Sequence, residues 1–142
     1  MATVETDPEL TKKILERATT IAVVGASANP NKPAHTVPAR MQQAGFRILP
    51  VNPTVEGELF GEKVYASLAE VPEKVDVVDV FRRSEDTPEV ARAAVEIGAG
   101  AIWLQQGIVS EESRRIAEEA GIDYVEDHCV AVERARYRID KS

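Results

Sequence analysis

Basic and polar residues gather in four short segments of a chain that is otherwise acidic. The segments are residues 25–33, 50–53, 81–84 and 105–109, and the formal net charge of the chain is −7 at pH 7. Two of them hold the cations Lys32, Arg82 and Arg83. They also share neutral hydrogen-bonding side chains, which are Ser27, Asn29, Asn52, Ser84, Gln105 and Gln106. Such a mixture suits an anion with many oxygen atoms, for example a phosphorylated nucleotide.

Each segment follows an apolar stretch with the length of a β-strand. We predict strands at residues 20–25, 46–51, 75–81, 101–104 and 122–125. Between them, helical spacing predicts helices at 7–18, 34–44, 87–97, 110–121 and 130–137, with a capping box opening a short helix at Ser67–Glu70. Alternating strands and helices are typical of right-handed βαβ units. We therefore expect an α/β fold, a Rossmann-like, doubly wound, five-stranded parallel sheet with helices on both faces, in a single domain spanning residues 1–142.

The predicted topology brings the four polar segments to one edge of the sheet. Open parallel sheets bind ligands at the carboxyl ends of their strands, near the point where the strand order reverses. The helix that starts after Pro33 would add backbone N–H donors for an anion. The alternative is that Lys32, Arg82 and Arg83 are ordinary solvated charges.

The first loop does not fit the common dinucleotide pattern. Only Gly25 of a G-x-G-x-x-G motif is present, and the second strand is followed by Asn52 and Pro53 instead of an acid that would hold ribose. A Walker-type lysine motif is also absent from the sequence. These features disfavour NAD and ATP on a P-loop.

Five motifs, in order along nearly the whole chain, resemble the CoA-binding domain family. They are Val24-Gly25-Ala26-Ser27 with Pro30, Lys32, Ala34 and His35; Pro50-Val51-Asn52-Pro53; Val80-Phe81-Arg82-Arg83-Ser84; Trp103-Leu104-Gln105-Gln106-Gly107; and Asp127-His128-Cys129 with Glu133. The family fold is similar to the N-terminal domain of the succinyl-CoA synthetase α subunit, which holds CoA. The resemblance implies CoA as the cofactor.

The resemblance also implies a set of ligand-binding residues. Residues around the diphosphate would be Gly25, Ala26, Ser27, Asn29 and Pro30, with Lys32 and Arg82 near phosphates. Asn52 and Pro53 would border the adenosine, and Gln105 and Gly107 would line the path to the pantetheine. Phe81 and Arg83 complete the set. One departure is His128, which stands where the family usually has an arginine.

The sequence contains no self-contained catalytic or metal-binding constellation. Its two histidines and single cysteine lack the spacing of a zinc site, and we expect Cys129 to be a structural thiol. Asp79, in an apolar strand, is expected to form a hydrogen bond to a helix terminus or a loop. Whether the chain catalyses a reaction stays open.

Three hypotheses about function follow. The first is a stand-alone protein that binds CoA or acyl-CoA without chemistry of its own. The second is a subunit that completes an acyl-CoA enzyme with a partner chain, and the third is an atypical NAD(P)-binding protein. A homodimer or an unidentified protein partner is compatible with each.

Net charge and cysteine content limit the partners and the compartment. An acidic chain repels polyanions, so we expect neither nucleic acid nor an anionic membrane surface as a partner. One cysteine cannot form an intramolecular disulfide, and the first residues do not read as a signal peptide. We expect a cytoplasmic protein.

Overall fold

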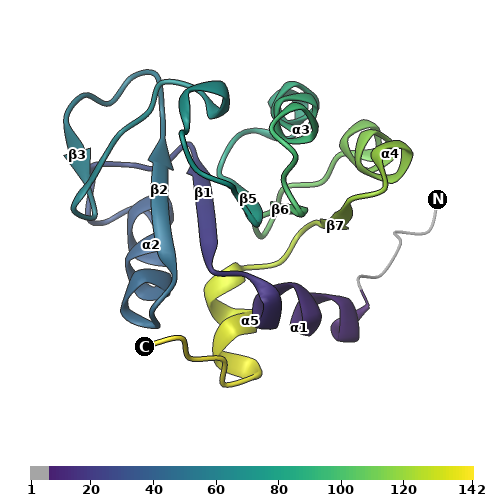
Figure 1. Cartoon of the computed structure of the whole chain (residues 1–142), viewed down its shortest axis with the longest axis horizontal. Coiled ribbons are helices and arrows are strands. Elements are labelled where there is room, and N and C mark those ends of the chain that lie inside the picture. The colour runs from purple at the N-terminus through teal and green to yellow at the C-terminus, as the bar shows by residue number, and fades with distance from the viewer. Residues whose placement is uncertain (1–6) are drawn as a thin grey trace.

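The computed structural model describes residues 7–142 and contains a five-stranded parallel sheet (Figure 1). Its strand order is β2-β1-β5-β6-β7. The strands are β1 (Thr20–Val24), β2 (Arg47–Val51), β5 (Val77–Val80), β6 (Ala101–Leu104) and β7 (Asp123–Val125). This arrangement confirms the predicted fold class.

Helices cover both faces of the sheet and bury a separate apolar cluster on each (Figure 1). One face packs against α1 (Pro8–Arg17), α2 (Pro33–Gln43) and α5 (Val130–Arg136). The other packs against α3 (Thr87–Glu96) and α4 (Glu111–Ala120). Because both faces are covered, the strands are largely apolar on both faces instead of alternating between apolar and polar residues.

Local capping signals explain where several helices begin and end. The Asp7 carboxylate accepts a hydrogen bond from the Glu9 N–H at 3.0 Å, and the Ser110 hydroxyl accepts one from the Ser113 N–H at 3.1 Å. Gly121 ends α4 in the left-handed conformation. No helix within residues 7–142 is long and apolar enough to cross a membrane.

The predicted capping box at Ser67–Glu70 is wrong in its contacts. A short 3₁₀ helix, η1 (Leu68–Glu70), does follow Ser67, but the Ser67 hydroxyl donates to the Glu70 carboxylate at 3.2 Å and caps no backbone N–H. A second 3₁₀ turn, η2 (Ser84–Asp86), precedes α3. The reciprocal cap does not form because the Ser67 hydroxyl and the Glu70 carboxylate bond to each other.

A β-hairpin that the sequence analysis did not predict lies between β2 and η1. It consists of β3 (Glu58–Leu59) and β4 (Glu62–Lys63), which pair antiparallel. Two residues per strand are too few to produce a readable alternation. The turn residue Phe60 has φ 57°, a left-handed conformation that is unfavourable for a bulky side chain.

Asp79 does not form the expected hydrogen bond. It lies in the central strand β5 between Val23 of β1 and Trp103 of β6, and only 1% of its surface is exposed. Its Oδ1 atom has no hydrogen-bond partner among the described residues. Burial therefore raises the pKa of the Asp79 carboxyl well above its ordinary value.

Candidate functional site

The strand order reverses between β1 and β5, and the glycine loop begins at this point. The chain leaves β1 for β2 on one side of the sheet and later returns to β5 on the other. Gly25 has φ 90°, and a Cβ atom there would overlap the carbonyl oxygen of Phe81. A glycine is therefore required on both counts, and it lets the loop turn directly above the end of β5.

The glycine loop is closed by short internal hydrogen bonds that leave some N–H groups available. The Asn29 N–H donates to the Ser27 hydroxyl oxygen at 3.0 Å, and the Asn31 N–H donates to the Asn29 side-chain oxygen at 3.0 Å. Within residues 7–142, no protein acceptor is bonded to the N–H groups of the exposed Ala28 and the partly exposed Ala34. These donors can take anionic oxygens at the start of α2.

Helix α2 has a charge pattern at its N-terminus that the other described α-helices lack. Lys32 occupies the N-cap, and the first turn contains no acid. The other four α-helices that the structure describes each carry an acid in the first turn, namely Glu9, Glu89, Glu111 with Glu112, and Glu133. A lysine at the positive end of a helix is unfavourable unless an anion binds there.

The two adjacent arginines differ in their surroundings. Arg83 contacts the carboxylates of Asp86 at 3.1 Å and Glu85 at 3.4 Å, and these acids raise the pKa of its guanidinium. Arg82 has no such ion pair among the described residues and lines a groove of about 240 Å³. The sequence analysis treated Arg82 and Arg83 alike, whereas in the structure Arg83 is paired with acids and Arg82 is not.

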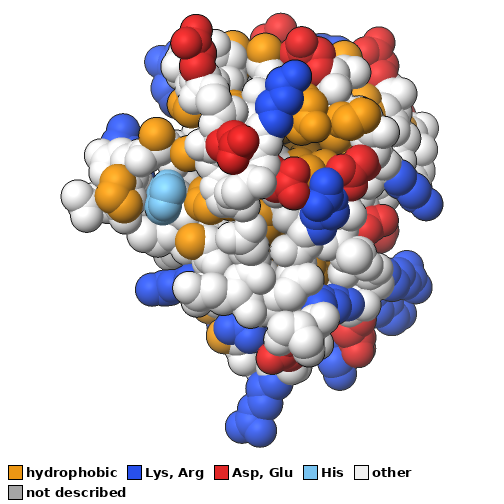
Figure 2. Space-filling view, turned by 60° about the vertical axis from the view of Figure 1, so that its left-hand side comes forward, with side chains coloured by type: hydrophobic (Ala, Val, Ile, Leu, Met, Phe, Trp, Pro, Cys, Tyr) orange, Lys and Arg blue, Asp and Glu red, His pale blue; other side chains and the backbone are white. Residues whose placement is uncertain are grey.

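The Arg82 groove has apolar walls and lies at the carboxyl ends of β1 and β2. Its apolar walls come from strand ends, η1 and α3, and include Val24, Val51, Pro53, Leu68, Val90 and Ala93. Two acids, Asp86 and Glu89, also line it together with Arg82. Figure 2 shows hydrophobic side chains recessed between basic and acidic ones near the upper edge, where the arrows of β1 and β2 end in Figure 1. The volume is below the about 300–1,000 Å³ typical of whole ligands, so it suits one moiety of a larger molecule.

A second, wider hollow of about 640 Å³ adjoins this groove at Pro53 and Ala66. Asn52 lies on its wall, but both ends of its side chain are already bonded. Its Nδ2 donates to the Ala26 carbonyl at 2.9 Å, and its Oδ1 accepts from the Thr54 N–H at 2.9 Å. Asn52 therefore ties the end of β2 to the glycine loop.

The loop after β6 is held in place from two sides. The Gly107 N–H donates to the Asp127 carboxylate at 2.6 Å, and the Val109 N–H donates to the Ser84 hydroxyl oxygen at 3.1 Å. Gln105 is only 5% exposed, and its Oε1 accepts from the Val130 N–H at 3.1 Å. Gln105 thus fixes the start of α5, while Gly107 is exposed at the edge.

Behind this loop, Glu126 forms a largely buried polar cluster. It pairs with Arg114 at 2.8 Å and accepts a hydrogen bond from the Tyr124 hydroxyl at 2.8 Å. Burial, and then the bond to Glu126, raise the pKa of the Tyr124 phenol. The Nδ1 atom of His128 lies 2.7 Å from the carbonyl oxygen of Glu126, so His128 supports the backbone of its own loop.

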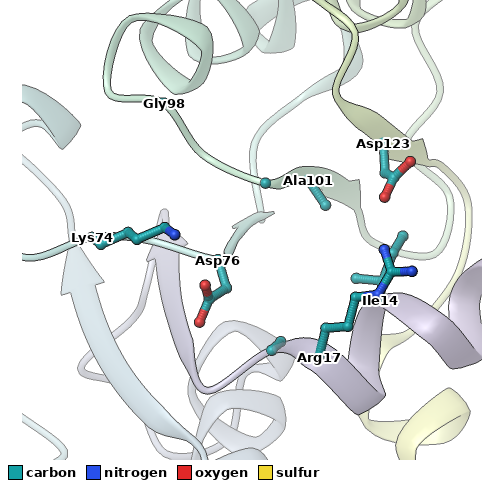
Figure 3. A pocket seen from close by; sticks show the side chains of 9 residues that line it. Ile14, Arg17, Lys74, Asp76, Gly98, Ala101 and Asp123 are labelled. Atoms are coloured by element: carbon teal, nitrogen blue, oxygen red, sulfur yellow. The ribbon is translucent and has the colours of Figure 1, made fainter.

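Another cavity, of about 270 Å³, lies at the opposite edge of the sheet (Figure 3). Arg17, Lys74, Asp76 and Asp123 surround it. The Asp76 carboxylate accepts bonds from the N–H groups of Thr19 and Thr20, both at 2.9 Å. It lies at the amino ends of the strands, whereas open parallel sheets bind ligands at the carboxyl ends, so it is a poor candidate for the nucleotide site.

The model of the CoA binding domain family matches residues 19–135 of the chain. The chain belongs to this family. Within it, the chain is similar to the uncharacterized protein YneT of Bacillus subtilis, with 44% identity over 124 residues, 87% of this chain and 91% of that protein. The family assignment confirms the resemblance seen in the sequence.

Two further relatives of this CoA binding domain chain differ greatly in length. The solved structure of cell-free ID.343 from Thermus thermophilus has 41% identity and a TM-score of 0.88, covering 93% of this chain and 99% of that one. Acetate–CoA ligase [ADP-forming] II of Archaeoglobus fulgidus is 33% identical over 101 residues. That match covers 69% of this chain but only 15% of the ligase.

The structure adds residues that the sequence analysis did not select. Ala66, Ser67, Leu68, Val90 and Ala93 line the Arg82 groove. Helical spacing predicted a helix at residues 87–97 without indicating a ligand, and nothing in the spacing of residues 66–68 indicated one either. The individual site residues chosen from the sequence stay predictions, although those at positions 25–32, 52–53, 81–83 and 107 lie at the predicted edge of the sheet.

Proposed function

We propose that this protein binds CoA or acyl-CoA at the carboxyl edge of its sheet and supplies no catalytic group of its own. The observation that carries the proposal is the N-terminus of α2. Lys32 stands there with no acid in the first turn, and the N–H groups of Ala28 in the glycine loop and Ala34 in the first turn have no acceptor among the described residues. A diphosphate would neutralise this local positive charge and accept hydrogen bonds from these donors.

The rest of the ligand is assigned by shape and charge. The adenine is assigned to the Arg82 groove for its apolar walls, although Asp86 and Glu89 also line it. The Arg82 guanidinium is assigned to a phosphate because no acid lies within ion-pair distance of it among the described residues. The pantetheine would run past Gly107, where the held loop leaves an open surface. Arg83 is not assigned to the ligand, since Asp86 and Glu85 already contact it.

The test is calorimetric titration of the purified protein with CoA, dephospho-CoA, acetyl-CoA and NADPH. We expect CoA and acetyl-CoA to bind, dephospho-CoA to bind more weakly and NADPH to produce no heat. Lys32→Ala and Arg82→Ala should each raise the Kd for CoA by about 5- to 150-fold, because each removes a charge-assisted hydrogen bond of about 1–3 kcal/mol.

Arg83→Ala is the matched control for Arg82→Ala. It removes the same type of charge one residue away, and we expect the Kd for CoA to change less than about 2-fold, within the scatter of surface substitutions. Equal losses in the two arginine variants would reject the assignment of Arg82 as the specific contact. Folded protein that binds NADPH in preference to CoA would support the atypical NAD(P) hypothesis instead.

A further inference from the structure

Ser27, in the middle of the glycine loop, is bonded through its backbone to two residues in the first turn of α2. Its N–H donates to the Ala34 carbonyl at 3.1 Å. Its carbonyl oxygen lies 2.7 Å from Nδ1 of His35. A carbonyl can only accept, so Nδ1 must carry the hydrogen, and this contact defines the tautomer of His35.

The Ala34 carbonyl lacks its usual helical donor, because Pro38 lies one helical turn further on. Residue 38 would normally donate its N–H to the carbonyl of residue 34, but proline has no N–H. Pro38 lies inside α2, where proline ordinarily weakens a helix. The released carbonyl is the acceptor that the glycine loop uses.

His35 is in turn supported by the β3–β4 hairpin. Its ring lies 5.0 Å, between centroids, from the ring of Phe60. The Phe60 carbonyl accepts a hydrogen bond from the Gln42 side chain of α2 at 2.6 Å. Phe60 keeps a left-handed backbone, and strained residues of this kind persist where the surrounding contacts hold them.

We propose that Pro38, His35 and Phe60 form a lock that holds the Ser27 peptide in its ligand-ready orientation, so that the hairpin controls CoA affinity. This inference rests on the proposed binding of CoA at the glycine loop. If the Ser27 carbonyl turned outward, its oxygen would repel a diphosphate. His35 is therefore a positioning residue that acts through Ser27, and the lock lowers the cost of ordering the loop on binding.

Two His35 variants separate the hydrogen bond from the ring contact. His35→Asn keeps an N–H donor at the same number of bonds from the backbone but loses the ring. His35→Phe keeps a ring against Phe60 but loses the donor. We expect His35→Phe to weaken CoA binding about 10-fold and His35→Asn to stay within about 3-fold of the parent. In the parent, ¹⁵N NMR of the imidazole should show hydrogen on Nδ1.

Pro38→Ala gives a second test in which binding and stability should move in opposite directions. The new N–H at residue 38 would compete with Ser27 for the Ala34 carbonyl, so CoA affinity should fall severalfold. The melting temperature should stay equal or rise, because alanine is a far better helix former than proline. Phe60→Ala should weaken CoA binding in the parent but not further in a His35→Ala background.

The outcomes distinguish this inference from the proposed function. If the parent does not bind CoA, both are overturned. If the parent binds CoA but folded His35→Phe and Pro38→Ala bind it equally well, only the lock is overturned. Hydrogen on Nε2 of His35 in place of Nδ1 would also overturn it. Weakened binding in both variants, with His35→Asn close to the parent, would establish the lock.

Discussion

The buried carboxyl of Asp79 leads to a quantitative prediction about stability. Asp79 is 1% exposed in the centre of the sheet, and its Oδ1 atom has no partner within the described part of the chain. A buried polar group without a partner costs about 1–3 kcal/mol. Asp79→Val replaces it with an apolar side chain that matches its neighbours in β5, so we expect the free energy of unfolding to rise by about 1–3 kcal/mol near pH 4 and by more at neutral pH.

The gain should depend on pH, with a sign that follows from the shifted pKa. Burial raises the pKa of Asp79 in the folded state well above its value in the unfolded chain, which is about 3.9. The folded protein therefore keeps the proton of Asp79 to a higher pH than the unfolded chain does. The contribution of this proton to stability is complete below about pH 4 and is lost as the pH rises toward the folded-state pKa. The slope can reach about 1.4 kcal/mol per pH unit.

Urea unfolding of the parent and Asp79→Val between pH 4 and 8 measures this effect. The difference in unfolding free energy should be smallest at pH 4 and grow with pH, and Tm at neutral pH should rise by about 2–4 °C for each kcal/mol. Asp79→Asn is the control, since it keeps the shape and removes the titration. A destabilised Asp79→Val whose deficit does not vary with pH would refute the reasoning.

Two further predictions concern the residues that shape the edge of the sheet. Gly107→Ala should lower the free energy of unfolding by about 1–3 kcal/mol of backbone strain, because the space around Gly107 is open. Gly25→Ala should lower it by more, because a Cβ at Gly25 would also overlap the Phe81 carbonyl. Chemical denaturation of both variants decides this, and equal losses would contradict it. Glu126→Gln should cost roughly 2–4 kcal/mol because its partner Arg114 is only 19% exposed, whereas Glu112→Gln in the exposed pair with Arg92 should cost less than about 1 kcal/mol. Similar thermal shifts in the two glutamine variants would argue against a buried ion pair.

Much of the fold could be predicted because its signals are local. Apolar runs fixed the five main strands to within about two residues, and caps such as Asp7 and Ser110 marked the helix starts. The β3–β4 hairpin could not be predicted, because its two-residue strands have no periodicity and depend on contacts with α2. Asp79 lacks its expected partner because an apolar face surrounds it, which only the packing reveals.

The candidate site, too, could be predicted from the sequence only in part. Sequence position placed Lys32, Arg82 and Gly107 correctly at the edge, since the ends of parallel strands must meet there. It did not distinguish Arg82 from Arg83, because the acids that pair with Arg83 sit in a turn whose geometry is set by the start of α3. It also did not show that Asn52 and Gln105 use their side chains to hold other segments.

The sequence by itself determined the alternation of strands and helices, the family and the edge of the sheet at which the polar loops meet. These depend on residue order, side-chain polarity and backbone preferences, all of which act over a few residues. Only the tertiary structure decided which polar groups are already bonded and which are available. Hydrogen bonds such as those of Ser27 with Ala34 and His35 depend on the distance and direction between segments, and these exist only once the helix has packed on the sheet.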